Sequence, residues 1–157
     1  MYHTVLFENL SFNQRSCLIN FIKENFPNIP YSGFGLESKT IIILNYENEK
    51  IVGCVCLLNN RLLNKVLNKS NTNLEYYNFN YTKGLFLYNL CVNENYRNKK
   101  MGSELVNQTC ILAKQLGIEY IHCHASTEVS RQLFIKQGFM EEKLIDETKN
   151  YLMSKFV

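Results

Sequence analysis

Short apolar runs alternate along the chain with longer segments in which apolar residues recur every three or four positions. The short runs are typical of strands, and the recurring pattern is typical of helices. Because both kinds of element must bury an apolar face in one core, the alternation predicts a single α/β layer structure. The expected strands span residues 2–8, 40–46, 51–58, 85–92, 118–125, 139–145 and 151–157, and the expected helices span residues 11–26, 103–116 and 128–137.

Residues with strong conformational preferences mark the ends of these elements. Ser11 is expected to cap the first helix, and Pro27 stops it. The polar turn 47–50 between two apolar runs predicts a hairpin. Gly117 and Gly138 are expected to end the two later helices. The apolar face of the first helix should hold Leu18, Ile22 and Phe26.

The bulk composition limits the class of protein. The 157 residues fit one domain over residues 1–157, and a formal net charge of +3 without a long basic stripe argues against a nucleic-acid binder. No apolar stretch is long enough to span a bilayer, and residues 1–8 do not resemble a signal peptide. The cysteines lie in apolar surroundings, which favours buried free thiols in a cytoplasmic protein. They are Cys17, Cys54, Cys56, Cys91, Cys110 and Cys123.

The segment that indicates chemistry is the polar loop 93–102, which joins an expected strand to an expected helix. The first backbone N–H groups of a helix have no partner inside it, and the helix dipole adds partial positive charge, so such an end binds phosphate well. Gly102 leaves room for an anion near the backbone, and Arg97, Lys99 and Lys100 add positive charge. A solvated basic loop before an ordinary helix would have the same residues, so physics alone leaves both interpretations open.

Residues 96–103, Tyr-Arg-Asn-Lys-Lys-Met-Gly-Ser, resemble the acyl-CoA-binding loop of the GNAT acetyltransferases. That family's pattern is Arg or Gln, two residues, Gly, one residue, then Gly or Ala. Arg97 and Gly102 match the pattern, and Lys100 stands where the first glycine belongs. A second stretch, residues 130–139, resembles the family's late helix and the Gly-Phe pair that follows it. The resemblance is good over residues 84–140 and rests on the order of elements elsewhere.

The resemblance implies a mixed, mostly antiparallel central sheet that is flanked by helices and splayed open between its fourth and fifth strands. Acetyl-CoA would lie in that opening, with its diphosphate on the amides of residues 98–103 and its pantetheine arm paired like a strand with Leu90 and Val92. A backbone N–H near Val92 would stabilise the developing oxyanion. The residues implied to bind the donor are Leu90, Cys91, Val92, Arg97, Asn98, Lys99, Lys100, Met101, Gly102, Ser103, Phe134 and Lys136.

The implied reaction is the attack of an amine on a thioester, which benefits from an acid for the leaving thiolate. Many family members have a tyrosine acid in the late helix, where this chain has Phe134. Ser126 and Ser130 resemble the Ser-x-x-x-Ser arrangement of arylalkylamine-type members, so Ser130 is the first candidate for the acid and Ser126 the second. Capping of the helix by Ser126 or Thr127 explains the same residues. Tyr88 is expected either to hold a water in the cleft or to pack, and no general base is identified.

Lys100 and two histidines have open interpretations. If the backbone at Lys100 needs a positive φ angle, a side chain there is unfavourable and donor affinity falls. His122 and His124 share one face of a strand. A proton-shuttling role for one of them is favoured over metal binding, because no third ligand is evident at a helpful spacing.

The acceptor is expected to meet the loop 27–37 and the segment 59–83, in which residues 61–67 have helical spacing and residues 70–81 read as loop. Aromatic side chains there suit the cation of an aryl or alkyl amine, and equally a homodimer surface or a core. They are Tyr31, Phe34, Tyr76, Tyr77, Phe79 and Tyr81. The Ser-x-x-x-Ser resemblance favours a small-molecule amine over a protein or peptide. A catalytically weak CoA-binding sensor is the rival from a different class.

Overall fold

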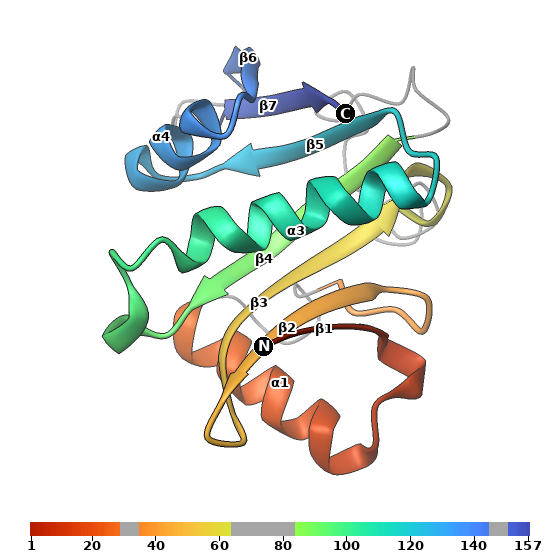
Figure 1. Ribbon diagram of the computed structural model, residues 1–157, viewed down its shortest axis with the longest axis vertical. Coiled ribbons are helices and arrows are strands. Elements are labelled where there is room, and N and C mark those ends of the chain that lie inside the picture. The colour runs from red at the N-terminus through yellow and green to blue at the C-terminus, as the bar shows by residue number, and fades with distance from the viewer. Residues whose placement is uncertain (29–34, 64–83, 145–150) are drawn as a thin grey trace. The chain divides into compact units, whose positions relative to one another are not determined.

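The computed structural model describes residues 1–28, 35–63, 84–144 and 151–157 (Figure 1). Its main helices are α1 (Phe12–Asn25), α3 (Met101–Gln115) and α4 (Glu128–Lys136), and its strands are β1 (Tyr2–Leu6), β2 (Ile41–Glu47), β3 (Lys50–Asn59), β4 (Gly84–Val92), β5 (Tyr120–Ala125), β6 (Met140–Leu144) and β7 (Tyr151–Phe156). The predicted elements are thus confirmed. The first strand ends early, because Phe7–Asn9 form the 3-10 turn η1. None of the helices in the described ranges has the length and hydropathy needed to cross a membrane.

The strands are hydrogen-bonded in the order β1-β2-β3-β4-β5-β7-β6. The pairs β1–β2, β2–β3, β5–β7 and β6–β7 are antiparallel, whereas β4 and β5 are parallel. This arrangement confirms the predicted mixed, mostly antiparallel sheet. The β4–β5 ladder joins residues 84–87 to residues 120–123. The predicted opening beyond that ladder stays a prediction.

The chain divides into two compact units, residues 1–57 with 89–105 and residues 58–88 with 106–157. In the first unit α1 begins as predicted: Ser11 Oγ accepts the N–H of Gln14 at 3.2 Å, and the Gln14 side chain accepts the N–H of Ser11 at 2.8 Å. This capping box fixes the start of the helix. The buried face consists of Leu18, Phe21 and Ile22. Phe26 was predicted on that face but is only half-buried, because the helix ends at Asn25.

The β2–β3 hairpin turns through Asn48 and Glu49, whose φ angles of 48° and 64° are both left-handed. Two consecutive left-handed residues indicate a type I′ turn, whose twist matches that of the strands it joins. The turn pairs Glu47 with Lys50 and thereby sets the register of the hairpin at this end. The predicted polar turn 47–50 is confirmed.

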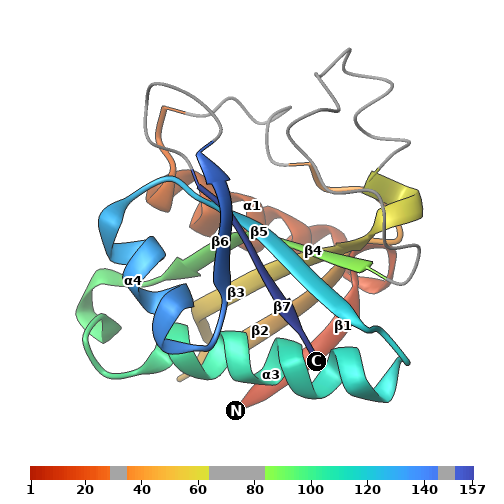
Figure 2. The same ribbon diagram turned by 90° about the horizontal axis from the view of Figure 1, so that it is seen from above.

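In the second unit α4 contacts β5, β6 and β7, which lie side by side in Figure 2. Phe134 of α4 is buried against Phe139, with 5.1 Å between the ring centroids. Gly117 ends α3 at a φ of 69°: its N–H donates to Lys114 O at 3.2 Å, and the next N–H donates to Ala113 O at 2.8 Å. This pair of bonds is a Schellman motif and confirms the predicted helix end.

All six cysteines are free thiols, as predicted. Five of them are buried, namely Cys54, Cys56, Cys91, Cys110 and Cys123. The prediction that Cys17 is also buried is wrong. Cys17 lies in α1 beside the buried stripe rather than on it, so its side chain is exposed to solvent.

Candidate active site

The loop 93–100, between β4 and α3, is fastened to the rest of the first unit. The Asn93 N–H donates to Val52 O at 2.9 Å, and Asn93 Oδ1 accepts the N–H of Asn95 at 3.0 Å. The Tyr96 hydroxyl hydrogen-bonds to Glu47, which raises the pKa of the Tyr96 phenol. These bonds tie the loop to β2 and β3, while residues 97–100 stay exposed to solvent.

Arg97 was predicted to contact the donor, and the structure shows a further use of its guanidinium. Arg97 Nε donates to Val92 O at 3.2 Å, and Arg97 Nη2 donates to Asn25 Oδ1 at 3.3 Å. A guanidinium has five N–H groups, so these two bonds leave donors for an anion. The Lys99 ammonium lies 5.4 Å from the Tyr96 ring centroid, where a cation is attracted to the ring.

The backbone at Asn98 and Lys100 is left-handed, with φ angles of 61° and 63°. Asparagine tolerates this region well, whereas lysine enters it at a cost of about 1–2 kcal/mol. The position where the sequence motif ordinarily has glycine therefore does need a positive φ in this chain. Lys100 adopts the required conformation in spite of its side chain, so the strain is carried by the folded loop.

The first turn of helix α3 carries backbone N–H groups that have no partner inside the helix. The carbonyl of Lys100 accepts the N–H of Glu104 at 2.9 Å, which is the first bond of the helix. Within the described ranges, no protein acceptor is recorded for the N–H groups of Met101, Gly102 and Ser103. The Met101 side chain does not face this end, because its Sδ lies 3.0 Å from the point where a Cβ on Gly53 would stand. The helix start thus has the donors and the dipole of an anion site.

The end of β4 is shaped by Asn89, which has a φ of 48° inside the strand. The Cys54 thiol donates to Asn89 O, with 3.7 Å between the sulfur and the oxygen. A hydrogen bond with Cys91, together with burial, raises the pKa of Cys54 well above its usual value. Cys91 is buried, whereas the flanking Leu90 and Val92 are half-buried. Because side chains alternate along a strand, Leu90 and Val92 lie on the face opposite Cys91.

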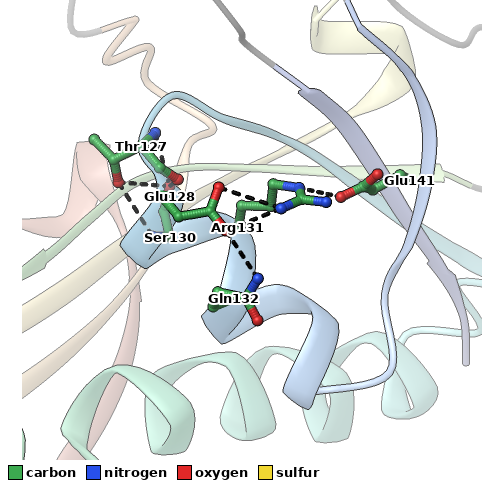
Figure 3. A network of polar contacts seen from close by, with 6 residues as sticks. All are labelled: Thr127, Glu128, Ser130, Arg131, Gln132 and Glu141. Carbon is green, nitrogen blue, oxygen red and sulfur yellow. Dashed lines mark hydrogen bonds and ion pairs between the residues drawn. The ribbon is translucent and has the colours of Figure 1, made fainter.

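The two predicted serines lie in different settings at the N-terminus of α4, in the second unit, and Figure 3 shows Ser130 beside Thr127. Thr127 is the N-cap: Thr127 Oγ1 accepts the N–H of Ser130 at 3.1 Å, and Ser130 Oγ accepts the N–H of Thr127 at 3.2 Å. Ser130 Oγ also donates to Thr127 O at 2.9 Å. Ser126 is exposed and lies ahead of the cap. The predicted capping of this helix is therefore confirmed for Thr127, and the Ser130 hydroxyl takes part in it.

An ion-pair network follows the cap on the same helix. Arg131 pairs with Glu128 at 2.9 Å and with Glu141 of β6 (Figure 3). Its guanidinium carbon also lies 4.8 Å from the Tyr151 ring centroid. Gln132 Nε2 also donates to Glu128 at 2.8 Å. These contacts fasten α4 to β6 and β7, so they orient the helix that carries Ser130.

The remaining predicted site residues of the second unit differ in accessibility. Phe134 is 2% exposed and packs in the core, which leaves Lys136, an exposed residue, as the accessible member of that predicted pair. Tyr88 is half-buried, and its ring stacks on Phe86 at 5.5 Å between centroids. Of the two interpretations offered for Tyr88, the packing contact is present.

His122 is fully buried, with no exposed surface. Its Nε2 lies 2.7 Å from Asn60 Oδ1, which requires the tautomer with a proton on Nε2, and no hydrogen bond of its Nδ1 is recorded among the described residues. Its ring lies 5.2 Å from Phe86 and 5.6 Å from Tyr120, between centroids. Burial first, and the neighbouring His124 second, lower the pKa of His122 from 6.5 to about 3. A proton-shuttling role for His122 therefore finds no support in its surroundings.

This burial predicts an acid-dependent loss of stability. His122 stays neutral in the folded protein down to about pH 3, whereas in the unfolded chain it takes up a proton below about pH 6.5. Because the unfolded state then binds more protons, we expect the free energy of unfolding to fall by about 1.4 kcal/mol for each pH unit below 6.5 from this residue alone. Urea unfolding of the wild type and His122→Gln from pH 7 to pH 4 measures it, and parallel pH profiles would contradict it.

Other predicted features fall outside what the structure describes or find no support in it. Residues 60–63 form a helical turn, and the rest of the segment 64–83 lies outside the described residues. The predicted acceptor residues outside the described ranges are Tyr31, Phe34, Tyr76, Tyr77, Phe79 and Tyr81. Over residues 1–28, 35–63, 84–144 and 151–157, no group of three or more His, Cys, Asp or Glu could hold a metal ion.

Comparison with known proteins identifies the family of this chain. The model of the family described as "Acetyltransferase (GNAT) family" matches residues 17–139. No curated protein matches the chain.

Several solved structures share the fold. ElaA from Escherichia coli is 16% identical, with 99% of this chain and 98% of that one covered and a TM-score of 0.73. An acyl-CoA N-acyltransferase from Pseudomonas aeruginosa is 12% identical, with 99% and 98% covered and a TM-score of 0.73. The ribosomal-protein-S18-alanine N-acetyltransferase from Escherichia coli is 11% identical, with 100% and 94% covered and a TM-score of 0.63.

Proposed function

The chain belongs to the acetyltransferase (GNAT) family of acyl-CoA-dependent N-acyltransferases, and on this premise we propose that it transfers an acetyl group from acetyl-CoA to a primary amine of a small molecule. The observation that carries the proposal is the start of α3. There the N–H groups of Met101, Gly102 and Ser103 face no protein acceptor within the described ranges, and a fastened basic loop leads into them. A diphosphate satisfies such donors.

In this proposal each part of the first unit has one task. The amides of residues 98–103 hold the diphosphate, and Lys99 and Lys100 add charge to it. The pantetheine arm pairs with the backbone of Leu90 and Val92, as an added strand would. Val92 O already accepts from Arg97, but a carbonyl oxygen has two lone pairs and can accept a second bond. The adjoining N–H polarises the thioester carbonyl.

The proposed chemistry is direct transfer in a ternary complex. The neutral amine attacks the thioester carbonyl carbon, and the carbonyl oxygen takes up negative charge. The carbon–sulfur bond then breaks, the thiolate of coenzyme A leaves and takes a proton, and the amine nitrogen loses one. We assign the acid for the thiolate to Ser130, with Ser126 as the second candidate, and we assign Tyr88 to a water that accepts the amine proton. Lys136 is proposed to contact the donor, whereas the buried Phe134 is not.

Ser130→Ala and Thr127→Ala separate the proposed acid from the helix cap. Both variants lose the capping box, so each is expected to lower the free energy of unfolding by about 1 kcal/mol. Only Ser130→Ala removes a proton donor from the thiolate, so only it should also lower kcat, by about a hundredfold. Steady-state kinetics and urea unfolding of both variants measure this. Equal kcat values for the two variants would restrict Ser130 to the cap.

The acceptor screen is the direct test of the function. The protein is incubated with acetyl-CoA and a panel of arylalkylamines, polyamines and peptides with free N-termini, and released thiol is followed with time. Thiol release that depends on a small amine supports the proposal. Faster release with peptides would favour the alternative of a protein or peptide acetyltransferase, which the likeness to an enzyme named for a ribosomal protein keeps open.

A second candidate function is a CoA-binding sensor with little turnover. It is favoured by Phe134, which has no proton to give, and by the Ser130 hydroxyl, which is engaged in the cap. Calorimetry with coenzyme A and the thiol assay distinguish the two. Tight binding without thiol release for any amine in the panel would favour the sensor over the enzyme.

A further inference from the structure

The last residue of α1 has a side chain that is fixed at both ends. Asn25 Nδ2 donates to Phe21 O at 2.9 Å, four residues back in the same helix. This bond turns Asn25 Oδ1 outward, where it accepts from Arg97 Nη2 at 3.3 Å. The C-terminus of a helix also carries partial negative charge, which favours a guanidinium beside it. Asn25 is therefore a built acceptor for Arg97, although the two residues are 72 positions apart.

Because Asn25 restrains Arg97, it also restrains the loop 93–100. Because the guanidinium is planar and rigid, its bonds to Asn25 Oδ1 and to Val92 O together fix both its position and its plane. Arg97 directly precedes Asn98, where the backbone enters the left-handed region that Lys100 also occupies. Strained conformations of this kind persist only where the surroundings determine them.

We propose that Asn25 is a positioning residue for the coenzyme A site, acting through Arg97 on the loop 93–100. The inference rests on the proposed function, since it assumes that this loop holds the diphosphate. With Asn25 in place, the loop has its binding conformation before coenzyme A binds. Without it, the bond to Val92 O is the one side-chain hydrogen bond of Arg97 that is left among the described residues. The loop must then be ordered each time coenzyme A binds, which weakens binding.

The test is calorimetric titration of coenzyme A into the wild type, Asn25→Ala and Asn25→Asp. Asn25→Ala removes the acceptor and is expected to raise Kd about three- to tenfold, the effect of one hydrogen bond. Asn25→Asp keeps an oxygen for Arg97 but loses the Nδ2 donor to Phe21 O and adds a negative charge, so its Kd should lie between those of Asn25→Ala and the wild type. Asn20→Ala, an exposed position in α1 outside this set of bonds, is the matched control and should bind as the wild type does.

A role in binding and a role in folding give different results. Urea unfolding shows that each variant is folded at the titration temperature, and the salt dependence of Kd should be the same in Asn25→Ala as in the wild type, because no phosphate contact is lost. Wild-type affinity in Asn25→Ala, or an equal loss in Asn20→Ala, would overturn the inference while leaving the proposed function intact. If the wild type itself does not bind coenzyme A, both are overturned.

Discussion

Replacing Gly102 with aspartate is expected to abolish coenzyme A binding while the protein stays folded. Gly102 lies in the first turn of α3, whose first N–H groups have no recorded acceptor in the described part of the protein. A carboxylate there takes the place of the diphosphate and repels it, so we expect Kd to rise by about a hundredfold or more, ~2.7 kcal/mol. The same charge stabilises a helix N-terminus by about 0.3–1 kcal/mol, so the free energy of unfolding should hold or rise.

Two further variants separate charge from bulk at this position. Gly102→Ala adds a Cβ without charge and should weaken coenzyme A binding far less than the aspartate does. Asn107→Asp adds the same charge further along α3, at an exposed position, and should leave Kd within about twofold. Calorimetry with coenzyme A and urea unfolding measure both quantities. A Gly102→Asp protein that binds coenzyme A like the wild type would show that the diphosphate is held elsewhere.

Gly84→Ala is expected to produce a large loss of stability. A Cβ on Gly84 would stand 2.2 Å from Nδ2 and 2.8 Å from Cγ of Asn60. Asn60 is 5% exposed and bonded to the buried His122, so it has little room to retreat and breaks that bond if it does. Overpacking together with a buried imidazole N–H that has lost its acceptor is expected to lower the free energy of unfolding by about 2–4 kcal/mol.

Gly53→Ala is the matched control for this effect. A Cβ on Gly53 would stand 3.0 Å from Met101 Sδ and 3.1 Å from Leu105 Cδ1, so two side chains must shift by a few tenths of an ångström, and the expected loss is about 1 kcal/mol. Urea unfolding with an unchanged m-value measures both variants. Adding Asn60→Ala to Gly84→Ala should relieve the overlap, giving less than the sum of the single effects. Equal losses for Gly84→Ala and Gly53→Ala would contradict the argument.

Most of the fold could be predicted from local patterns, because local chemistry specifies most of its element ends. The capping box at Ser11, the I′ turn at Asn48 and Glu49, and the Schellman motif at Gly117 all depend on residues within a few positions of each other. The errors arise where the pattern alone does not decide. Cys17 looked buried because its neighbours are apolar, yet it lies beside the helix stripe and is exposed.

The candidate site could be predicted only in part, and for a related reason. The loop 93–102 could be recognised from the sequence because its motif residues are contiguous. The residues that hydrogen-bond to the loop come from distant parts of the chain. Neither Asn25 nor Glu47 could be associated with the loop from the sequence, since each meets it only after folding. Asn60 was missed in the same way, because its pairing with His122 depends on the tertiary structure. The left-handed φ of Asn89 likewise has no signal in a run that reads as a plain strand.

The strand order determines which edges of the sheet could pair with another chain and so lead to aggregation. In the described part of the chain, β1 and β6 each pair with one strand only, so both are outermost strands. β6 carries the charged residues Glu141 and Glu142, and charged side chains on an outermost strand disfavour the addition of another strand. β1 carries no such charge over Tyr2–Leu6 and is guarded only by its five-residue length. The two edge strands therefore differ in how well they resist aggregation, and we expect β1 to pair with another chain more readily than β6.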